Sequence, residues 1–244
     1  MRRETYMIKK IHHAYLAIVL ASLCLLSMNT EARASLMIDA SVGGAPTGVN
    51  YVNFDDLTLG SVGGVSGGVT VSFSGDGQAV QGSESGQYAA PYLSNGNGTL
   101  FGDPNDGPDT TTYLSTGTGS VTLLLPGQQM YLGLLWGSVD NYNTLSLYNG
   151  DTLVGTITGS DVTNNADGNQ GVNGTYYVNI NSTLSFDKVV ATSSSNAFEF
   201  DNVAFNPSAV PEPSSFIMAF FGGIGMFAYR QRRRNGRTNN LKLA

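Results

Sequence analysis

The stretch MYLGLLWGSVDNYNTLSLYNGDTLVGTIT, residues 130–158, contains three short apolar runs separated by polar turn residues. In MYLGLLW and in TLSLY, apolar residues alternate with other residues, so they share one face of an extended chain. Asn149-Gly150 lies between the second and third runs, and both residues tolerate positive φ. The stretch therefore predicts a strand over 130–137, followed by a hairpin of strands over 144–148 and 152–158.

Similar runs recur along residues 35–209, each bounded by Gly, Asn, Asp or Ser. The further expected strands are 49–54, 69–74, 120–125, 175–180, 184–192 and 197–205. No stretch carries apolar residues at the 3.6-residue spacing of a surface helix. Many short strands with frequent turn signals predict an all-β fold, an antiparallel, jelly-roll-like β-sandwich. Trp136 lies on an apolar strand face and is expected in its core.

Residues 82–119 contain few regular runs, and we expect a long loop there. Such a loop either binds a partner or packs on its own aromatic residues. Within it, DPNDGPD places Asp103, Asn105 and Asp109 at spacings that suit oxygen ligands of calcium. The twelve-residue EF-hand pattern is not met, because no glutamate closes the loop. An acidic turn punctuated by proline is the alternative interpretation.

Acidic residues also follow aromatic residues in the first and last expected strands, VNFDDL and FEFDNVAF. Terminal strands of a jelly roll are often neighbours, which would bring Asp55, Asp56 and Asp201 together. They could bind an ion. The alternative is that they end strands and cap turns through their local backbone.

The charge of residues 35–209 is strongly negative. Lys188 is the only basic residue in this span, against 15 acidic ones, so its formal charge is −14. Such a surface repels the phosphates of nucleic acids, which we exclude as partners. The span also lacks histidine and cysteine. Triad-type nucleophiles and His or Cys ligation of zinc are therefore excluded, while paired carboxylates and oxygen-bound calcium remain open.

The N-terminus predicts a secretory signal peptide over residues 1–34. A basic start is followed by an apolar stretch over 14–28 and by the small residues of EARAS. Signal peptidase is expected to cut between Ala34 and Ser35 during export through the inner membrane. An uncleaved N-terminal anchor is the alternative.

The C-terminal residues 210–244 combine VPEP, an apolar segment and a cluster of arginines. The expected helix over 214–230 is short for a permanent membrane anchor, since the fourteen uncharged residues from Phe216 to Tyr229 cover about 21 Å of a hydrocarbon core about 30 Å thick. The arrangement resembles the PEP-CTERM sorting signal. The matching residues are Pro211, Glu212 and Pro213, followed by Arg230, Arg232, Arg233 and Arg234.

This resemblance implies recognition by an exosortase, a transient hold of the C-terminal helix in the membrane, and release to the cell surface or the extracellular matrix. A simple C-terminal anchor is the alternative. Stretches such as GQYAAPYLS, LGLLWGSVDNYNTLSLYNGDTLVG and FEFDNVAF also resemble one subfamily of exosortase-dependent surface proteins, over most of residues 50–206. That similarity implies export and no particular activity.

Three functions remain open for the exported domain. The leading hypothesis is a non-enzymatic surface or matrix protein. The second is a carbohydrate-binding module for exopolysaccharide, supported by calcium, which exposed aromatic residues on one face would favour. The third is a glycosidase, which needs two carboxyls in one cleft, one of them with a raised pKa.

Overall fold

The computed structural model describes residues 34–210. The expected signal peptide, the Pro-Glu-Pro triplet, the helix over 214–230 and the arginine cluster lie outside the described residues. Within residues 34–210, no helix is long and apolar enough to cross a membrane.

The regular structure of the described chain is almost entirely β-strand, and every strand pair in it is antiparallel. The predicted all-β antiparallel class is therefore confirmed. The strands are β1 (Leu36–Ser41), β2 (Asn50–Val52), β3 (Gly64–Ser66), β4 (Val69–Ser74), β5 (Gln78–Val80), β6 (Tyr92–Leu93), β7 (Gly107–Pro108), β8 (Tyr113–Thr116), β9 (Ser120–Gly137), β10 (Asn143–Asn149), β11 (Thr152–Thr158), β12 (Tyr176–Ser193) and β13 (Phe198–Asn206). Two single turns of helix, η1 (Thr99–Phe101) and α2 (Gly159–Val162), interrupt them.

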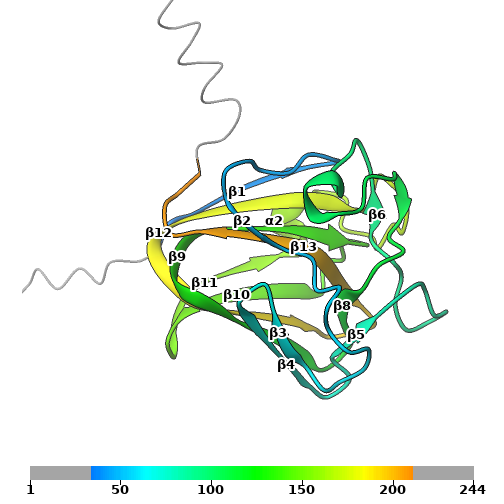
Figure 1. Ribbon diagram of the computed structural model, residues 1–244, viewed down its shortest axis with the longest axis horizontal. Helices are drawn as coiled ribbons and strands as arrows, with labels where there is room; N and C mark the ends of the chain where they lie inside the picture. Colours follow the sequence, from blue (N-terminus) through cyan, green and yellow to red (C-terminus); the bar gives the residue numbers. More distant parts are fainter. Residues whose placement is uncertain (1–33, 211–244) are drawn as a thin grey trace, which may run out of the picture. The chain divides into compact units, whose positions relative to one another are not determined.

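The sandwich is one sheet folded over itself by two long strands. The first half of β9 pairs with β4 and with the second half of β12, whose other edge pairs with β10 and so leads to β11. The second half of β9 pairs with β13 and with the first half of β12, whose other edge pairs with β1. Figure 1 shows β9 and β12 curving together at the end where the two layers join.

The set of alternate residues that faces the core changes across this curve. Before it, the β9 residues of the main core are odd-numbered, such as Val121 and Leu123; after it they are even-numbered, such as Leu132 and Leu134. The register between β9 and β12 shifts over the same region. The prediction of separate strands over 120–125 and 130–137 is therefore wrong: they are one strand. The same holds for 175–180 and 184–192, which are both parts of β12.

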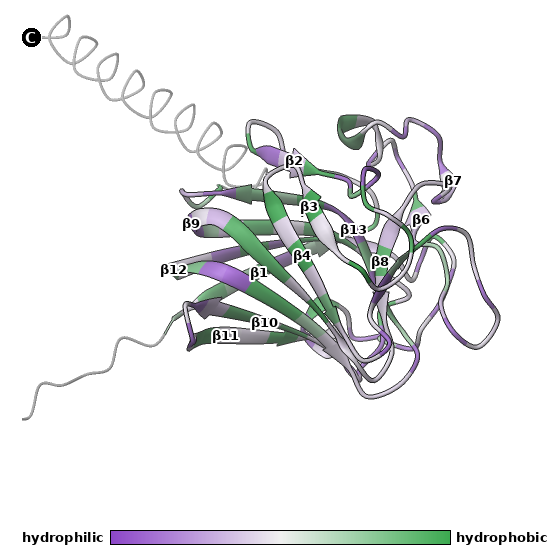
Figure 2. Ribbon diagram, turned by 60° about the horizontal axis from the view of Figure 1, so that its bottom comes forward, coloured by the Kyte–Doolittle hydropathy of each residue, from purple (hydrophilic) through white to green (hydrophobic). Residues whose placement is uncertain are grey.

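The core lies between the two layers. Trp136 is fully buried there and stacks on Phe198 with ring centroids 4.3 Å apart, so its expected core position is confirmed. Figure 2 shows hydrophobic and hydrophilic residues alternating along β4, as a half-buried strand requires.

The predicted long loop corresponds to a segment that covers the outer face of β9 and β13. We call residues 82–112 the covering segment. Its Leu93 and Phe101 pack on Tyr131 and Tyr177 of the outer sheet face, and its Tyr88 contacts Tyr113 edge to face. The expectation that aromatic residues hold this segment is confirmed, although β6, η1 and β7 add short regular structure.

The predicted hairpin between β10 and β11 is present, with Gly150 at φ +58° in its turn. Asn149 pairs with Thr152, so the two turn residues are Gly150 and Asp151, one position later than expected.

Candidate functional site

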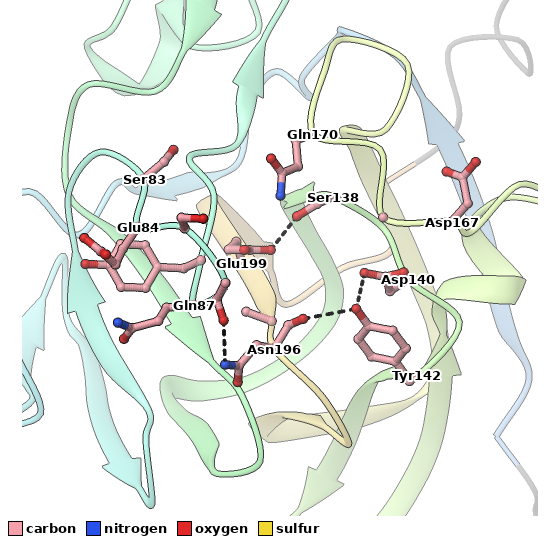
Figure 3. Close-up of a pocket in the computed structure, with 15 residues that line it drawn as sticks. Ser83, Glu84, Gln87, Ser138, Asp140, Tyr142, Asp167, Gln170, Asn196 and Glu199 are labelled. Atoms are coloured by element: carbon pink, nitrogen blue, oxygen red, sulfur yellow. Dashed lines mark hydrogen bonds between the residues drawn. The ribbon is translucent and has the colours of Figure 1, made fainter.

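A pocket opens at the end of the sandwich where β9 ends and β13 begins. Its volume is about 560 Å³. Four loops form its wall: the start of the covering segment, the turn after β9, the loop before β12 and the turn before β13 (Figure 3). The residues whose side chains carry its chemistry are Glu84, Gln87, Tyr88, Ser138, Asp140, Tyr142, Asp167, Gln170, Asn196 and Glu199.

Glu199 is buried at the base of this pocket. It alternates with Phe198 and Phe200 along β13, so its side chain points away from the core and under the covering segment. The backbone N–H of Ala89 donates to its Oε1 at 2.7 Å, and Ser138 Oγ donates to its Oε2 at 2.5 Å. Burial raises the pKa of Glu199 to about 7, although both hydrogen bonds oppose the rise. Both carboxyl oxygens therefore serve to fix the pocket wall.

Asp140 and Tyr142 form a second polar pair on the pocket wall. The Tyr142 hydroxyl donates to Asp140 Oδ2 at 2.6 Å and lies 3.2 Å from the backbone oxygen of Asn196. Burial raises the pKa of the Asp140 carboxyl, and the charge of Asp167 raises it further, while the Tyr142 hydrogen bond opposes the shift. Figure 3 shows Asn196 bridging from this pair toward the covering segment.

The pocket is rich in hydrogen-bond acceptors and lacks basic side chains. Four carboxyls line it, from Glu84, Asp140, Asp167 and Glu199, and no lysine or arginine does. Amide and hydroxyl groups supply the remaining polar atoms. Such a lining suits a ligand that offers many hydroxyl or amine donors, and it repels anions.

A break in β13 turns a second acidic residue toward the covering segment. Asn202 has φ +52°, and the pairing of β13 with β9 shifts between Asp201 and Ala204. This irregularity returns Val203 to the core after Phe200, as a bulge does. Asp201 is left fully buried outside the core.

The structure brings together acidic residues that the sequence placed in two separate groups. Strand β2 pairs with β13, as expected for the terminal strands, and the charge of Asp55 acts on Asp201. Asp56, the third residue expected there, is exposed. Asp109, from the predicted calcium loop, is buried and also acts on Asp201.

The other two residues of the predicted calcium loop point elsewhere. Asp103 accepts a hydrogen bond from the backbone N–H of Asn105 at 3.2 Å, and Asn105 is exposed. Among residues 34–210, no group of three or more acidic, histidine or cysteine side chains is placed to hold a metal ion. Asp109 is thus the one member of the predicted trio that joins a buried cluster.

Sequence reasoning did not identify the pocket. Glu199 and Ser138 are far apart in the chain and meet because β13 pairs with β9, with Glu199 opposite Gly137. The available signal was the alternation in FEF, which puts a carboxylate on the outward face of a buried strand. Of the aromatic residues near the pocket, Tyr142 and Tyr88 are partly exposed.

Both ends of the described chain lie at the opposite end of the sandwich. The Ser35 backbone N–H donates to Thr183 Oγ1 at 2.9 Å. Val210 forms two hydrogen bonds with the Asn181 side chain, at 2.8 and 2.9 Å. These contacts place both ends beside the curve of β12, whereas the pocket lies at the start of β13.

Comparison with known proteins identifies the C-terminal segment. Residues 209–234 match the PEP-CTERM protein-sorting motif, which confirms the resemblance seen in the sequence and supports export with exosortase-directed sorting. No curated protein matches the chain. Among solved structures, a mutant of CBM29-2, a family 29 carbohydrate-binding module, matches at 14% identity and a TM-score of 0.27, over 74% of this chain and 99% of that chain. At this TM-score the likeness says nothing about function.

Proposed function

We propose that the protein is exported, processed at both ends, and presented at the cell surface or in the extracellular matrix as a non-enzymatic binding module. The observation that carries this proposal is the sorting motif at residues 209–234, which begins three residues after the last strand, β13. In this route signal peptidase cuts between Ala34 and Ser35. An exosortase then acts near Pro211, Glu212 and Pro213, while the helix over 214–230 holds the chain briefly in the membrane.

The arrangement of the domain supports presentation outward from its attachment. β13 runs from the pocket at Glu199 to Asn206 near the C-terminal end of the domain. Eight residues of strand span about 26 Å, so the pocket opens well away from a chain held at its C-terminus. The two ends and the binding surface therefore do not compete for space.

The pocket chemistry supports binding over catalysis. Burial raises the pKa of Glu199 to about 7, but this carboxyl is 2% exposed and both of its oxygens accept protein hydrogen bonds. A general acid must offer its proton to the substrate. Glu199 instead fastens the covering segment and the turn after β9.

A test of the sorting route is intact mass spectrometry of protein from the surface and medium of the native host. We expect a form that begins at Ser35 and ends near Pro211. Glu212→Ala should retain the C-terminal segment in the membrane fraction, whereas Asn239→Ala, beyond the matched residues, should be processed normally. Wild-type protein that still carries residues 216–244 in the membrane would refute the sorting proposal.

Carbohydrate binding is the second candidate, and the acceptor-rich pocket is the observation that favours it. Sugars offer many hydroxyl donors, and a pocket without cations favours neutral or amino sugars over uronic acids. Affinity electrophoresis in the host exopolysaccharide should retard the exported protein. Gln87→Ala with Gln170→Ala, both exposed on the pocket wall, should remove the retardation. Gln128→Ala, outside the pocket, should keep it, and no new reducing ends should form.

A further inference from the structure

Two buried carboxyl groups face each other beneath the covering segment. Asp109 comes from that segment and is 2% exposed, whereas Asp201 comes from β13 and is 0% exposed. Asp109 Oδ1 accepts hydrogen bonds from the Thr111 backbone N–H at 2.8 Å and from its hydroxyl at 2.6 Å. The other three oxygens of the pair, Asp109 Oδ2 and both oxygens of Asp201, are buried and have no hydrogen-bond partner.

No side chain neutralises this pair. Lys188 is the only basic residue among residues 34–210, and it is bridged to Asp151 at 3.0 Å. Asp55 adds a further carboxylate nearby, tied to the covering segment because its Oδ1 accepts from the Thr112 backbone N–H at 3.0 Å. Burial raises the pKa of Asp201 well above its usual range, and the Asp109 carboxyl raises it further.

Two kinds of partner could satisfy buried carboxyls: a proton shared between them or a cation. One shared proton makes one O–H···O hydrogen bond between the two carboxyls and leaves a net charge of −1 buried in a site without a basic side chain. A divalent cation neutralises both carboxylates and accepts several oxygen ligands. The charge balance therefore favours a divalent cation.

We propose that a calcium ion binds between Asp109 and Asp201. Calcium takes six to eight oxygen ligands in flexible geometry, so two carboxylates can be completed by backbone carbonyls and water. Zinc is disfavoured because residues 34–210 contain no histidine or cysteine. The proposed calcium site therefore differs from the one predicted from the sequence: it lies at the buried contact between Asp109 and β13, and not in the exposed part of the loop over 103–109.

Such an ion would fasten the covering segment to the sheet. Asp109 lies near the end of this segment and Asp201 lies in β13. The start of the same segment lines the pocket, where Ala89 binds Glu199. Calcium would therefore stabilise the pocket wall by holding the far end of the covering segment against β13. This site does not depend on the sorting route or on the identity of the pocket's ligand.

The experiment uses exported protein purified from the host medium, stripped with EDTA and dialysed. Thermal unfolding and isothermal titration calorimetry are then measured with calcium chloride alone. At calcium about 100-fold above Kd, we expect the Tm to rise by about 5 to 10 °C. Asp201→Asn, which keeps the shape of the side chain, should abolish both the heat of binding and the Tm rise. Asp103→Asn, in the exposed loop, should retain both.

Three outcomes would overturn the proposal. The first is a wild-type protein whose Tm does not respond to calcium while Asp201→Asn unfolds at a higher temperature in EDTA, which would assign the pair a shared proton. The second is an equal calcium response in Asp201→Asn. The third is loss of the response in Asp103→Asn only, which would return calcium to the exposed loop.

Discussion

The buried Glu199 carboxyl makes the stability of the domain depend on pH. Its pKa in the folded protein is about 7, compared with an ordinary value of 4.5. The folded state therefore holds this proton more tightly than the unfolded state. The stabilisation is complete below pH 4.5, falls as the pH rises, and is lost above about pH 7. A difference of about 2.5 pKa units corresponds to roughly 3 kcal/mol.

Glu199→Gln isolates this contribution. Glutamine keeps the acceptor for the Ala89 N–H, and its amide can donate to Ser138 Oγ, so both contacts survive without a buried charge. We expect the variant to match the wild type near pH 4.5. At pH 8 it should unfold at a temperature higher by roughly 6 to 12 °C, since 1 kcal/mol corresponds to about 2–4 °C in a domain of this size.

The assay is thermal unfolding followed by circular dichroism between pH 4.5 and 8. Asp140 and Asp201 also have raised pKa values, but they titrate in wild type and variant alike, so the difference reports Glu199. Glu84→Gln is the matched control, because it removes an exposed carboxyl from the same pocket. Its profile should run parallel to that of the wild type. If the Glu199→Gln profile also ran parallel, the assigned burial and pKa of Glu199 would be refuted.

Three further predictions follow from the packing. Trp136 is the only tryptophan of the chain and is fully buried, so fluorescence should be blue-shifted and resist iodide quenching; strong quenching in the native state would contradict its core position. Gly133→Ala should lower stability by about 1–3 kcal/mol in urea unfolding, because its Cβ would lie 2.8 Å from Tyr177 Oη and closer still to Tyr131 Oη, while Thr122→Ala should change it less. Asp76→Ala should cost about 1–2 kcal/mol at neutral pH by removing the acceptor for the N–H groups of residues 117–119. Although burial opposes it, these donors lower the pKa of Asp76, so the difference from wild type should shrink as the pH falls below 3.8; a constant difference would argue against this role.

The strands were predictable where one face is buried and the other is not. The range 69–74 agrees with β4, because period-two alternation directly reports a half-buried strand, and the range 152–158 agrees with β11, which follows the predicted turn at Asn149-Gly150. The continuity of β9 was not predictable from such a pattern. Pro126-Gly127 resembles a turn in sequence, yet the chain curves there and continues in the opposite layer with its parity reversed.

Local sequence patterns could not predict the pocket, because its residues come together only through the order in which the strands pair. Glu199 and Ser138 belong to elements whose pairing the sequence does not state. The buried acidic pair was partly predictable from the sequence: Asp109 and Asp201 were each identified as candidate ion ligands, but in two different candidate sites. Their meeting depends on how the covering segment folds back over β13, and no periodicity encodes that path.

The negative charge of this domain has a structural use beyond solubility. Loops without ladder partners leave backbone N–H groups that must find acceptors. In this domain carboxylates supply many of them: Asp106 accepts from Asn95 and Gly96, Asp187 from Gly150, and Glu199 from Ala89.

Such acceptors suit an exported domain with long loops and a single lysine, since each carboxylate is stabilised by backbone dipoles and needs no basic side chain. Asp201 departs from this rule, because both of its oxygens are buried without a well-formed hydrogen bond. Backbone donors serve Glu199 and one oxygen of Asp109, whereas Asp109 Oδ2 and both oxygens of Asp201 lack such donors. That difference makes the Asp109–Asp201 contact the place in the fold where an added cation would contribute most.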